Sequence, residues 1–115
     1  MKKKILIVIA NYYDDISKGL ITSAKKELKS NIKLSIIYVP GVFEIPITIK
    51  KNIKKYDGFI ALGCVIRGQT PHFDFISKST TDAIMLLSIE HTKPIANGIL
   101  TCLNKNQAIK RKNKG

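Results

Sequence analysis

The stretch GFIALGCVI, residues 58–66, decides the fold class of this chain. It contains no charged residue, and it lies between the polar pair Tyr56-Asp57 and the pair Arg67-Gly68. A parallel strand that is covered by helices on both faces reads as a continuous apolar run of this kind. We therefore predict that residues 58–66 form a central strand of a buried parallel sheet.

Similar apolar runs alternate with amphipathic stretches on both sides of this strand. We predict further strands over residues 5–10, 32–39 and 94–101, and helices over residues 16–29, 43–55, 73–90 and 105–112. The spacing of Ile45, Ile49 and Ile53 gives the second helix one buried face, and Leu20, Ala24 and Leu28 do the same for the first. With right-handed crossovers, this order predicts an α/β three-layer sandwich with a mostly parallel four-stranded sheet, flavodoxin-like, in a single domain over residues 1–115.

Composition argues against several partners and sites. The formal charge of +12 comes mainly from scattered lysines, with Arg67 and Arg111 as the only arginines, whereas specific nucleic-acid readers rely on arginine. We expect no nucleic-acid partner, and a basic nucleic-acid-binding domain is the competing reading that a salt-dependent affinity would reveal. No apolar run approaches the roughly 20 residues of a membrane span, so we expect no membrane partner. Cys64 and Cys102 lack metal-ligand spacing and fit reduced, buried thiols in a cytoplasmic protein.

The segments immediately after the predicted strands hold the candidate site. In an open parallel sheet, ligands bind outside the carboxyl ends of the strands. The segments in question are residues 11–13, 40–44, 67–72 and 101–102. Together they bring aromatic, acidic, phosphate-compatible and acid/base groups to one rim of the predicted sheet.

The segment after the central strand is the most informative of the four. Gly68-Gln69-Thr70 leads into the start of a helix, where free backbone N–H groups and the helix dipole favour a phosphate. The alternative is that Thr70 or Asp74 only caps the helix. His72 comes next, at the mouth of this anion site. It is either a structural histidine or a group that moves protons in a reaction of the bound ester.

Residues near the first two strands also have two readings. The charge of Glu44 stabilises the start of a helix through the dipole, or its carboxylate, flanked by the Val42 and Phe43 amides, binds the hydroxyls of a polyol. Tyr12 and Tyr13 are ordinary rim aromatics, or one of them stacks on a flat heterocycle. The residues alone leave both questions open.

Several motifs in one register resemble lumazine synthase, an enzyme of riboflavin biosynthesis. They are ILIVIANYYDDI (residues 5–16), PGVFEIP (40–46), ALGCVIRGQTPHFD (61–74) and NGILTCLNKNQAIKR (97–111). Agreement of several motifs in order across the chain is far more specific than one short pattern. The resemblance implies a transferase that condenses 5-amino-6-(D-ribitylamino)uracil with 3,4-dihydroxy-2-butanone 4-phosphate, releasing orthophosphate and water, with no cofactor and no metal.

The resemblance also implies a role for each matching position. Tyr12 stacks on the pyrimidine; Val42, Phe43 and Glu44 bind the ribityl chain; Cys64, Val65 and Ile66 line the ring; Gln69 and Thr70 cradle the phosphate; His72 transfers protons; and Arg111 reaches the phosphate from a neighbouring subunit. Asn97 stands where many members have a phenylalanine that contacts the ring, so its contact differs. Lys114 is a further candidate phosphate contact.

Assembly is part of what the resemblance implies. Members form homopentamers, alone, paired or in an icosahedral shell, with active sites between adjacent subunits, and riboflavin synthase is a further partner to consider. The sequence reaches residue 115 without the family's final helix, so we expect the fold to lack it. Two rival functions share this fold: a shell-forming or flavin-binding homologue without turnover, and an archaeal-type riboflavin synthase. The intact RGQTPHFD segment, residues 67–74, favours a phosphate substrate over the latter.

Overall fold

The computed structural model describes residues 3–10, 14–27, 31–66 and 73–102. Its elements in chain order are β1 (Lys3–Ala10), α1 (Asp14–Glu27), β2 (Ile32–Val39), the 3₁₀ helix η1 (Val42–Glu44), α2 (Ile45–Lys51), β3 (Gly58–Ile66), α3 (Phe73–His91) and β4 (Ile95–Cys102). The last predicted helix, residues 105–112, lies outside the described residues. In the described part of the chain, no helix is both long and apolar enough to cross a membrane.

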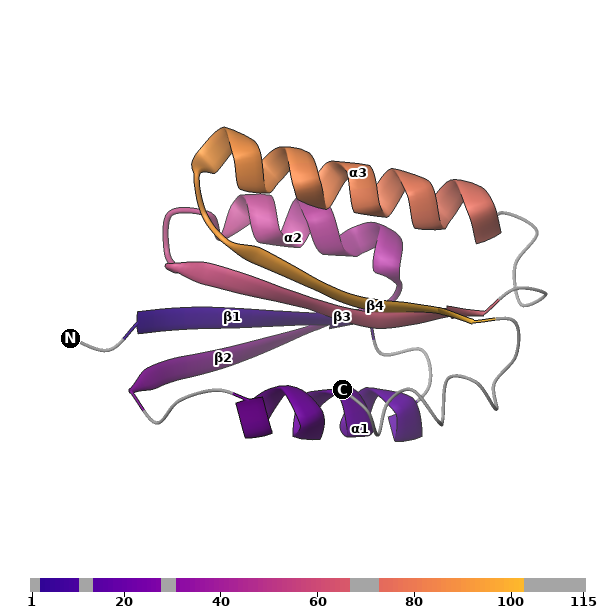
Figure 1. Cartoon of the computed structure of the whole chain (residues 1–115), viewed down its shortest axis with the longest axis horizontal. Helices are drawn as coiled ribbons and strands as arrows, with labels where there is room; N and C mark the ends of the chain where they lie inside the picture. The colour runs from indigo at the N-terminus through magenta and orange to yellow at the C-terminus, as the bar shows by residue number, and fades with distance from the viewer. Residues whose placement is uncertain (1–2, 11–13, 28–30, 67–72, 103–115) are drawn as a thin grey trace.

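The four strands form one sheet in the order β2-β1-β3-β4, and every neighbouring pair is parallel. The helices α2 and α3 cover one face of the sheet, and α1 lies on the other face (Figure 1). The predicted α/β three-layer arrangement with a four-stranded parallel sheet is confirmed. The strand at residues 58–66 has β1 and β4 as neighbours, so its predicted central place is also confirmed.

The core consists of two apolar clusters, one on each face of the sheet. Alternate residues of β1 divide between them because successive side chains of a strand point to opposite faces. Leu6 and Val8 belong to the cluster under α2 and α3, whereas Ile7 and Ile9 belong to the cluster that includes Leu20 of α1. All four β1 side chains are fully buried, as expected for a strand in the interior of a sheet covered on both faces.

The predicted buried face of α1 is confirmed in part, and the helix begins two residues earlier than predicted. Leu20 is buried and Ala24 packs against the same cluster, whereas Leu28 lies outside the described residues. Ser17 lies inside the helix and donates a hydrogen bond from Oγ to the Ala10 carbonyl, at 3.3 Å. This bond ties the first turns of α1 to the end of β1.

The helix α2 is shorter than predicted. Ile45, Ile49 and Ile53 are all buried as expected, but the α-helix ends at Lys51 and Ile53 lies in a turn. Asn52 ends the helix by donating from Nδ2 to the Thr48 carbonyl, at 2.8 Å. A helix of 7 residues is about 10 Å long, whereas the 8-residue β2 is about 26 Å long. The amino ends of β1 and β2 therefore extend beyond α2.

Candidate functional site

The carboxyl ends of the four strands lie at one edge of the sheet. Because all the strands are parallel, Ala10, Val39, Ile66 and Cys102 mark this edge. The turn η1 comes directly after β2, and α3 begins at the same edge (Figure 1). Two groups of predicted site residues lie here: residues 42–44 in η1, and residues 64–66 at the end of β3.

The turn η1 lies directly on the sheet because β3 has a glycine beneath it. Val42 is buried, and a Cβ atom added at Gly63 would lie 2.8 Å from Val42 Cγ1 and 3.2 Å from Ala10 Cβ. Only a residue without a side chain allows this close approach. Gly63 was missed as a site residue by the sequence analysis, although a glycine inside an apolar strand often marks such an approach.

The backbone of Glu44 is fixed in the turn by hydrogen bonds, whereas its side chain is exposed to solvent. Its N–H donates to the Gly41 carbonyl at 3.2 Å, and its carbonyl accepts from Thr48 Oγ1 at 2.9 Å. Glu44 occupies the N-cap position of α2, but its side chain makes no capping hydrogen bond. The charge therefore lies where the helix dipole favours it, and the carboxylate oxygens remain available to accept from a ligand.

Two exposed aromatic rings lie next to each other beside this turn. Phe43 is 56% exposed and Phe75, in the first turn of α3, is 64% exposed. Their ring centroids are 6.4 Å apart, with the rings tilted by 32°. This distance is within the range of an aromatic contact. Phe75 had no signal in the sequence, because its contact depends on where α3 lies over the sheet.

The end of β3 presents its side chains to both faces. Val65 is buried in the cluster under α2 and α3, whereas Cys64 packs against the cluster on the α1 side. The expectation of a buried thiol is wrong for Cys64, which is only partly buried. Ile66 pairs with Cys102 in the last step of the ladder. Because the side chains of Cys64 and Val65 point to opposite faces of the sheet, a ligand can contact both residues only through their main chain, at the end of the strand.

Asn97 lies away from the other described candidates. It pairs with Ala61, three residues before the level of Cys64, which is about 10 Å along the strand. Its exposed side chain accepts a hydrogen bond at Oδ1 from the Ile99 N–H, at 3.0 Å. The structure thus does not bring Asn97 to the η1 turn of its own chain.

Tyr12, Gln69, Thr70, His72 and Arg111 lie outside the described residues, as does Lys114. Within the described ranges, no three His, Cys, Asp or Glu side chains are grouped so that they could hold a metal ion.

A parallel sheet of this strand order, with helices on both faces, defines the flavodoxin-like class of α/β proteins, whose ligands bind at the carboxyl edge. A family model described as 6,7-dimethyl-8-ribityllumazine synthase matches residues 2–115. The chain belongs to this family.

Curated relatives agree with the family match. The chain is 46% identical to a 6,7-dimethyl-8-ribityllumazine synthase of Bartonella henselae, with 99% of this chain and 80% of that protein covered. It is 43% identical to the synthase of the same name from Agrobacterium fabrum, with 93% and 78% covered, and 41% identical to that of Afipia carboxidovorans, with 94% and 71% covered.

Proposed function

We propose that this chain is a transferase of riboflavin biosynthesis that forms 6,7-dimethyl-8-ribityllumazine. Its substrates are 5-amino-6-(D-ribitylamino)uracil and 3,4-dihydroxy-2-butanone 4-phosphate. The observation that carries the proposal is the family match over residues 2–115. The geometry of the η1 turn supports it, because the turn offers an exposed carboxylate on a fixed backbone at the ligand-binding edge.

The η1 turn is our proposed binding site for the ribityl chain. Val42 anchors the turn in the core, so the main chain of residues 42–44 is held against β3. The carboxylate of Glu44 then accepts hydrogen bonds from ribityl hydroxyls. Tyr12 stacks on the pyrimidine, and the main chain of Cys64, Val65 and Ile66 lines the edge of the ring. A buried anchor of this kind lowers the entropic cost of ordering the turn when a ligand binds.

In this proposal, residues 69, 70 and 111 bind the phosphate group and residue 72 transfers protons. Gln69 and Thr70 cradle the phosphate, together with Arg111 of an adjacent copy. The amine of the pyrimidine attacks the ketone and water leaves to form an imine. A proton leaves the carbon next to the imine, the C–O bond to phosphate breaks, and the leaving oxygen keeps the electron pair. The resulting enol becomes a ketone, the ribityl-bearing amine attacks that ketone, and loss of a second water closes the ring. His72 moves protons in these steps. Most of the rate acceleration comes from holding the two reactants in the correct relative orientation.

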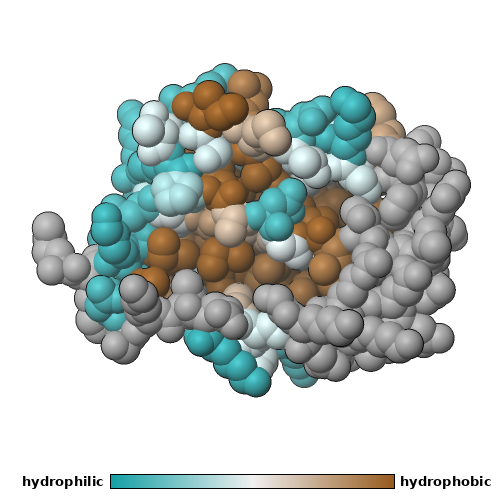
Figure 2. Space-filling model, in the orientation of Figure 1, coloured by the Kyte–Doolittle hydropathy of each residue, from teal (hydrophilic) through white to brown (hydrophobic). Residues whose placement is uncertain are grey.

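We further propose a cytoplasmic homopentamer, alone or as a multiple up to an icosahedral shell. Four exposed apolar side chains of α3 support an assembly: Phe75, Met85, Leu86 and Ile89. Figure 2 shows apolar side chains gathered in the middle of the face on which β4 and α3 lie. Asn97 is on this exposed edge strand, so we propose that it contributes to the site of an adjacent copy.

A direct experiment is to mix the purified protein with both substrates, monitor lumazine fluorescence and measure particle mass by light scattering. Fluorescent product from a pentamer or larger particle supports the proposal. An assembled particle without product supports a shell-forming or flavin-binding homologue instead. Product made from two lumazine molecules, with release of riboflavin, would identify the archaeal-type riboflavin synthase activity.

A further inference from the structure

A cationic pocket lies at the amino end of the sheet, opposite the candidate active site. It has a volume of about 420 Å³ and is lined by Lys4, Lys33, Ser35, Lys54, Lys55 and Tyr56. An adjoining hollow of about 360 Å³ shares four of these residues and adds Lys3, Asp57 and Lys93. Lys4 is six residues before the end of β1, about 20 Å from the carboxyl edge. The pocket is therefore distinct from the proposed catalytic site.

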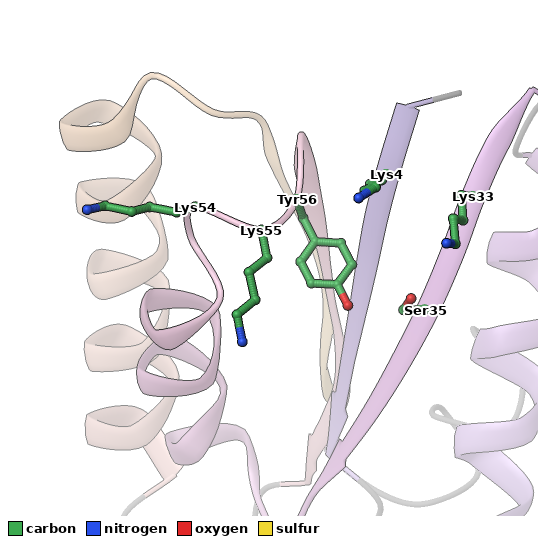
Figure 3. A pocket seen from close by; sticks show the side chains of 6 residues that line it. All are labelled: Lys4, Lys33, Ser35, Lys54, Lys55 and Tyr56. Carbon is green, nitrogen blue, oxygen red and sulfur yellow. The ribbon is translucent and has the colours of Figure 1, made fainter. Parts of the chain in front are cut away.

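The pocket exists because α2 is short. Lys4 of β1 and Lys33 of β2 are each the second residue of their strand, and Ser35 is the fourth residue of β2, whereas the short α2 ends at Lys51. The turn after α2 provides Lys55 and Tyr56 as the facing wall (Figure 3). Three separate segments of the chain thus surround one hollow.

Hydrogen bonds hold these walls in place. Lys93 Nζ donates to the carbonyls of Ile53 and Tyr56, the latter at 2.8 Å, and so fixes the turn that carries Lys55. Lys4 and Asp57 form a reciprocal pair: the Lys4 N–H donates to Asp57 Oδ2 at 2.7 Å, and the Asp57 N–H donates to the Lys4 carbonyl at 2.8 Å. This pair joins β1 to the same turn, so the main chain around the pocket is held in place by the protein itself.

The ring of Tyr56 is also held. It packs edge-on against Phe59, with ring centroids 6.0 Å apart and an angle of 64° between the rings. In Figure 3 the Tyr56 hydroxyl points toward Ser35 and the space between Lys55 and Lys33, whereas Lys54 extends away from them. Besides Lys54, the pocket is lined by the ammonium-bearing Lys4, Lys33 and Lys55 and by the hydroxyls of Ser35 and Tyr56, all of which can donate hydrogen bonds.

The charge of this pocket is not balanced by the protein. Among the described residues, none of the four lysines that line it forms an ion pair. Asp57 is the only acidic residue lining the two hollows, and its Oδ2 already accepts from the Lys4 main chain. Like charges gathered around one cavity repel each other and raise the local concentration of anions.

We propose that this pocket binds a small anion that carries several phosphate groups. Donors from three segments around a cavity of small-molecule size fit a chain of linked phosphates better than a single phosphate. Lysine binds phosphate as a point charge, without the bidentate geometry of arginine, and the described part of the chain contains no arginine. The Tyr56 ring packs on Phe59, so it is not a free stacking platform for a nucleic-acid base.

Inorganic triphosphate is the probe, titrated into the full chain in a calorimeter. We expect the double variant Lys33→Gln with Lys55→Gln to bind it about tenfold more weakly. The matched control is Lys25→Gln with Lys26→Gln, which removes the same charge from α1 on the other face of the sheet and should change the affinity less than about twofold. Equal losses in the two variants would show nonspecific attraction and overturn the proposal.

Four further measurements separate this pocket from other sites. Arg111→Ala should retain triphosphate binding, and the Lys33/Lys55 variant should retain its rate of lumazine formation; failure of the first would place the ligand at the catalytic edge. Orthophosphate should bind about tenfold more weakly than triphosphate, and equal affinity would overturn the requirement for linked phosphates. A short single-stranded oligonucleotide that binds more tightly than triphosphate, with the same dependence on Lys33 and Lys55, would overturn the small-anion assignment.

Discussion

Because Gly63 has no side chain, the η1 turn can approach the sheet closely at this point. Its neighbours at that point are Val42 and Ala10, which are both buried and too short to move aside. An added methyl group would meet Val42 Cγ1 at 2.8 Å, well inside van der Waals contact. The position of the η1 turn, which we propose to bind the ribityl chain, therefore depends on a residue that has no side chain.

Substitution of Gly63 tests this dependence. We expect Gly63→Ala to lower the free energy of unfolding by about 1–3 kcal/mol, because overpacking in a dense core forces neighbours out of place. Urea denaturation monitored by circular dichroism measures the change. Gly41→Ala is the control: its added Cβ meets only the flexible, exposed Glu44 carboxylate at 3.1 Å, in an extended backbone with φ −152. Equal stabilities of the two variants would contradict the close-approach argument.

The catalytic proposal is tested at single residues. We expect His72→Ala to retain weak activity, because orientation of the two reactants persists without the proton-transfer group. We expect Arg111→Ala chiefly to raise the KM for the phosphate substrate, because it removes a contact to that group. Steady-state kinetics with each substrate varied in turn measures both effects. A wild-type rate for the first variant, or an unchanged KM for the second, would remove that residue from its role.

At the level of elements, strand bounds were more predictable than the length of α2. The bounds of β2 and β3 match the prediction, because Pro40-Gly41 and Arg67-Gly68 interrupt both apolar runs. The four-residue spacing of Ile45, Ile49 and Ile53 predicted one longer helix, yet Ile53 is buried from a turn. Spacing reports which side chains are buried, and it does not distinguish a helix from a compact turn at the end of that helix.

The candidate site, too, was predictable from the sequence only in part. Residues 42–44 were expected at the rim because parallel strands end at the same edge, whereas residues 64–66 were expected there from the family resemblance. The structure places both groups at this edge. The contact between Phe43 and Phe75 could not be predicted, since it depends on the position of α3 relative to η1. The local sequence thus predicts which residues lie at the end of each strand, whereas contacts between elements require the packed structure.

Lys93 joins elements that are far apart in sequence. Its ammonium group donates to two main-chain carbonyls of the turn after α2, from a partly buried position. We expect Lys93→Met to lower the free energy of unfolding by about 1–3 kcal/mol, because both carbonyls lose a charged donor. Lys78→Met is the control, since the Lys78 pair with Asp82 is exposed and contributes within about 0.5 kcal/mol. Thermal unfolding that ranks the two variants equally would contradict this role.

At the scale of the whole molecule, the helix α3 exposes large apolar side chains whose contact with water is unfavourable. Ile89 is 70% exposed and Leu86 is 56% exposed. An exposed apolar patch of this kind marks an interface in many proteins. These side chains support our proposal that the functional unit is an assembly of several copies.

A charge on this helix tests the assembly. We expect Leu86→Glu to lower the particle mass and to abolish lumazine formation, because a charge buried in an apolar interface is costly. Sedimentation velocity measures the mass, and circular dichroism checks that the fold persists. Thr81→Glu adds the same charge at an exposed polar position of α3 and should leave the mass unchanged. A folded Leu86→Glu protein of unchanged mass would exclude Leu86 from the interface.

The hydrogen bond between Asn97 and Ile99 has a consequence for how copies of the chain meet. β4 is at the end of the described sheet, and an end strand invites pairing with another chain. Here the Ile99 N–H is already engaged by the Asn97 amide oxygen. A strand arriving from a neighbour would have to displace that amide before it could lengthen the sheet. We therefore expect neighbouring copies to join at this boundary by interlocking side chains, so that each sheet ends within its own subunit.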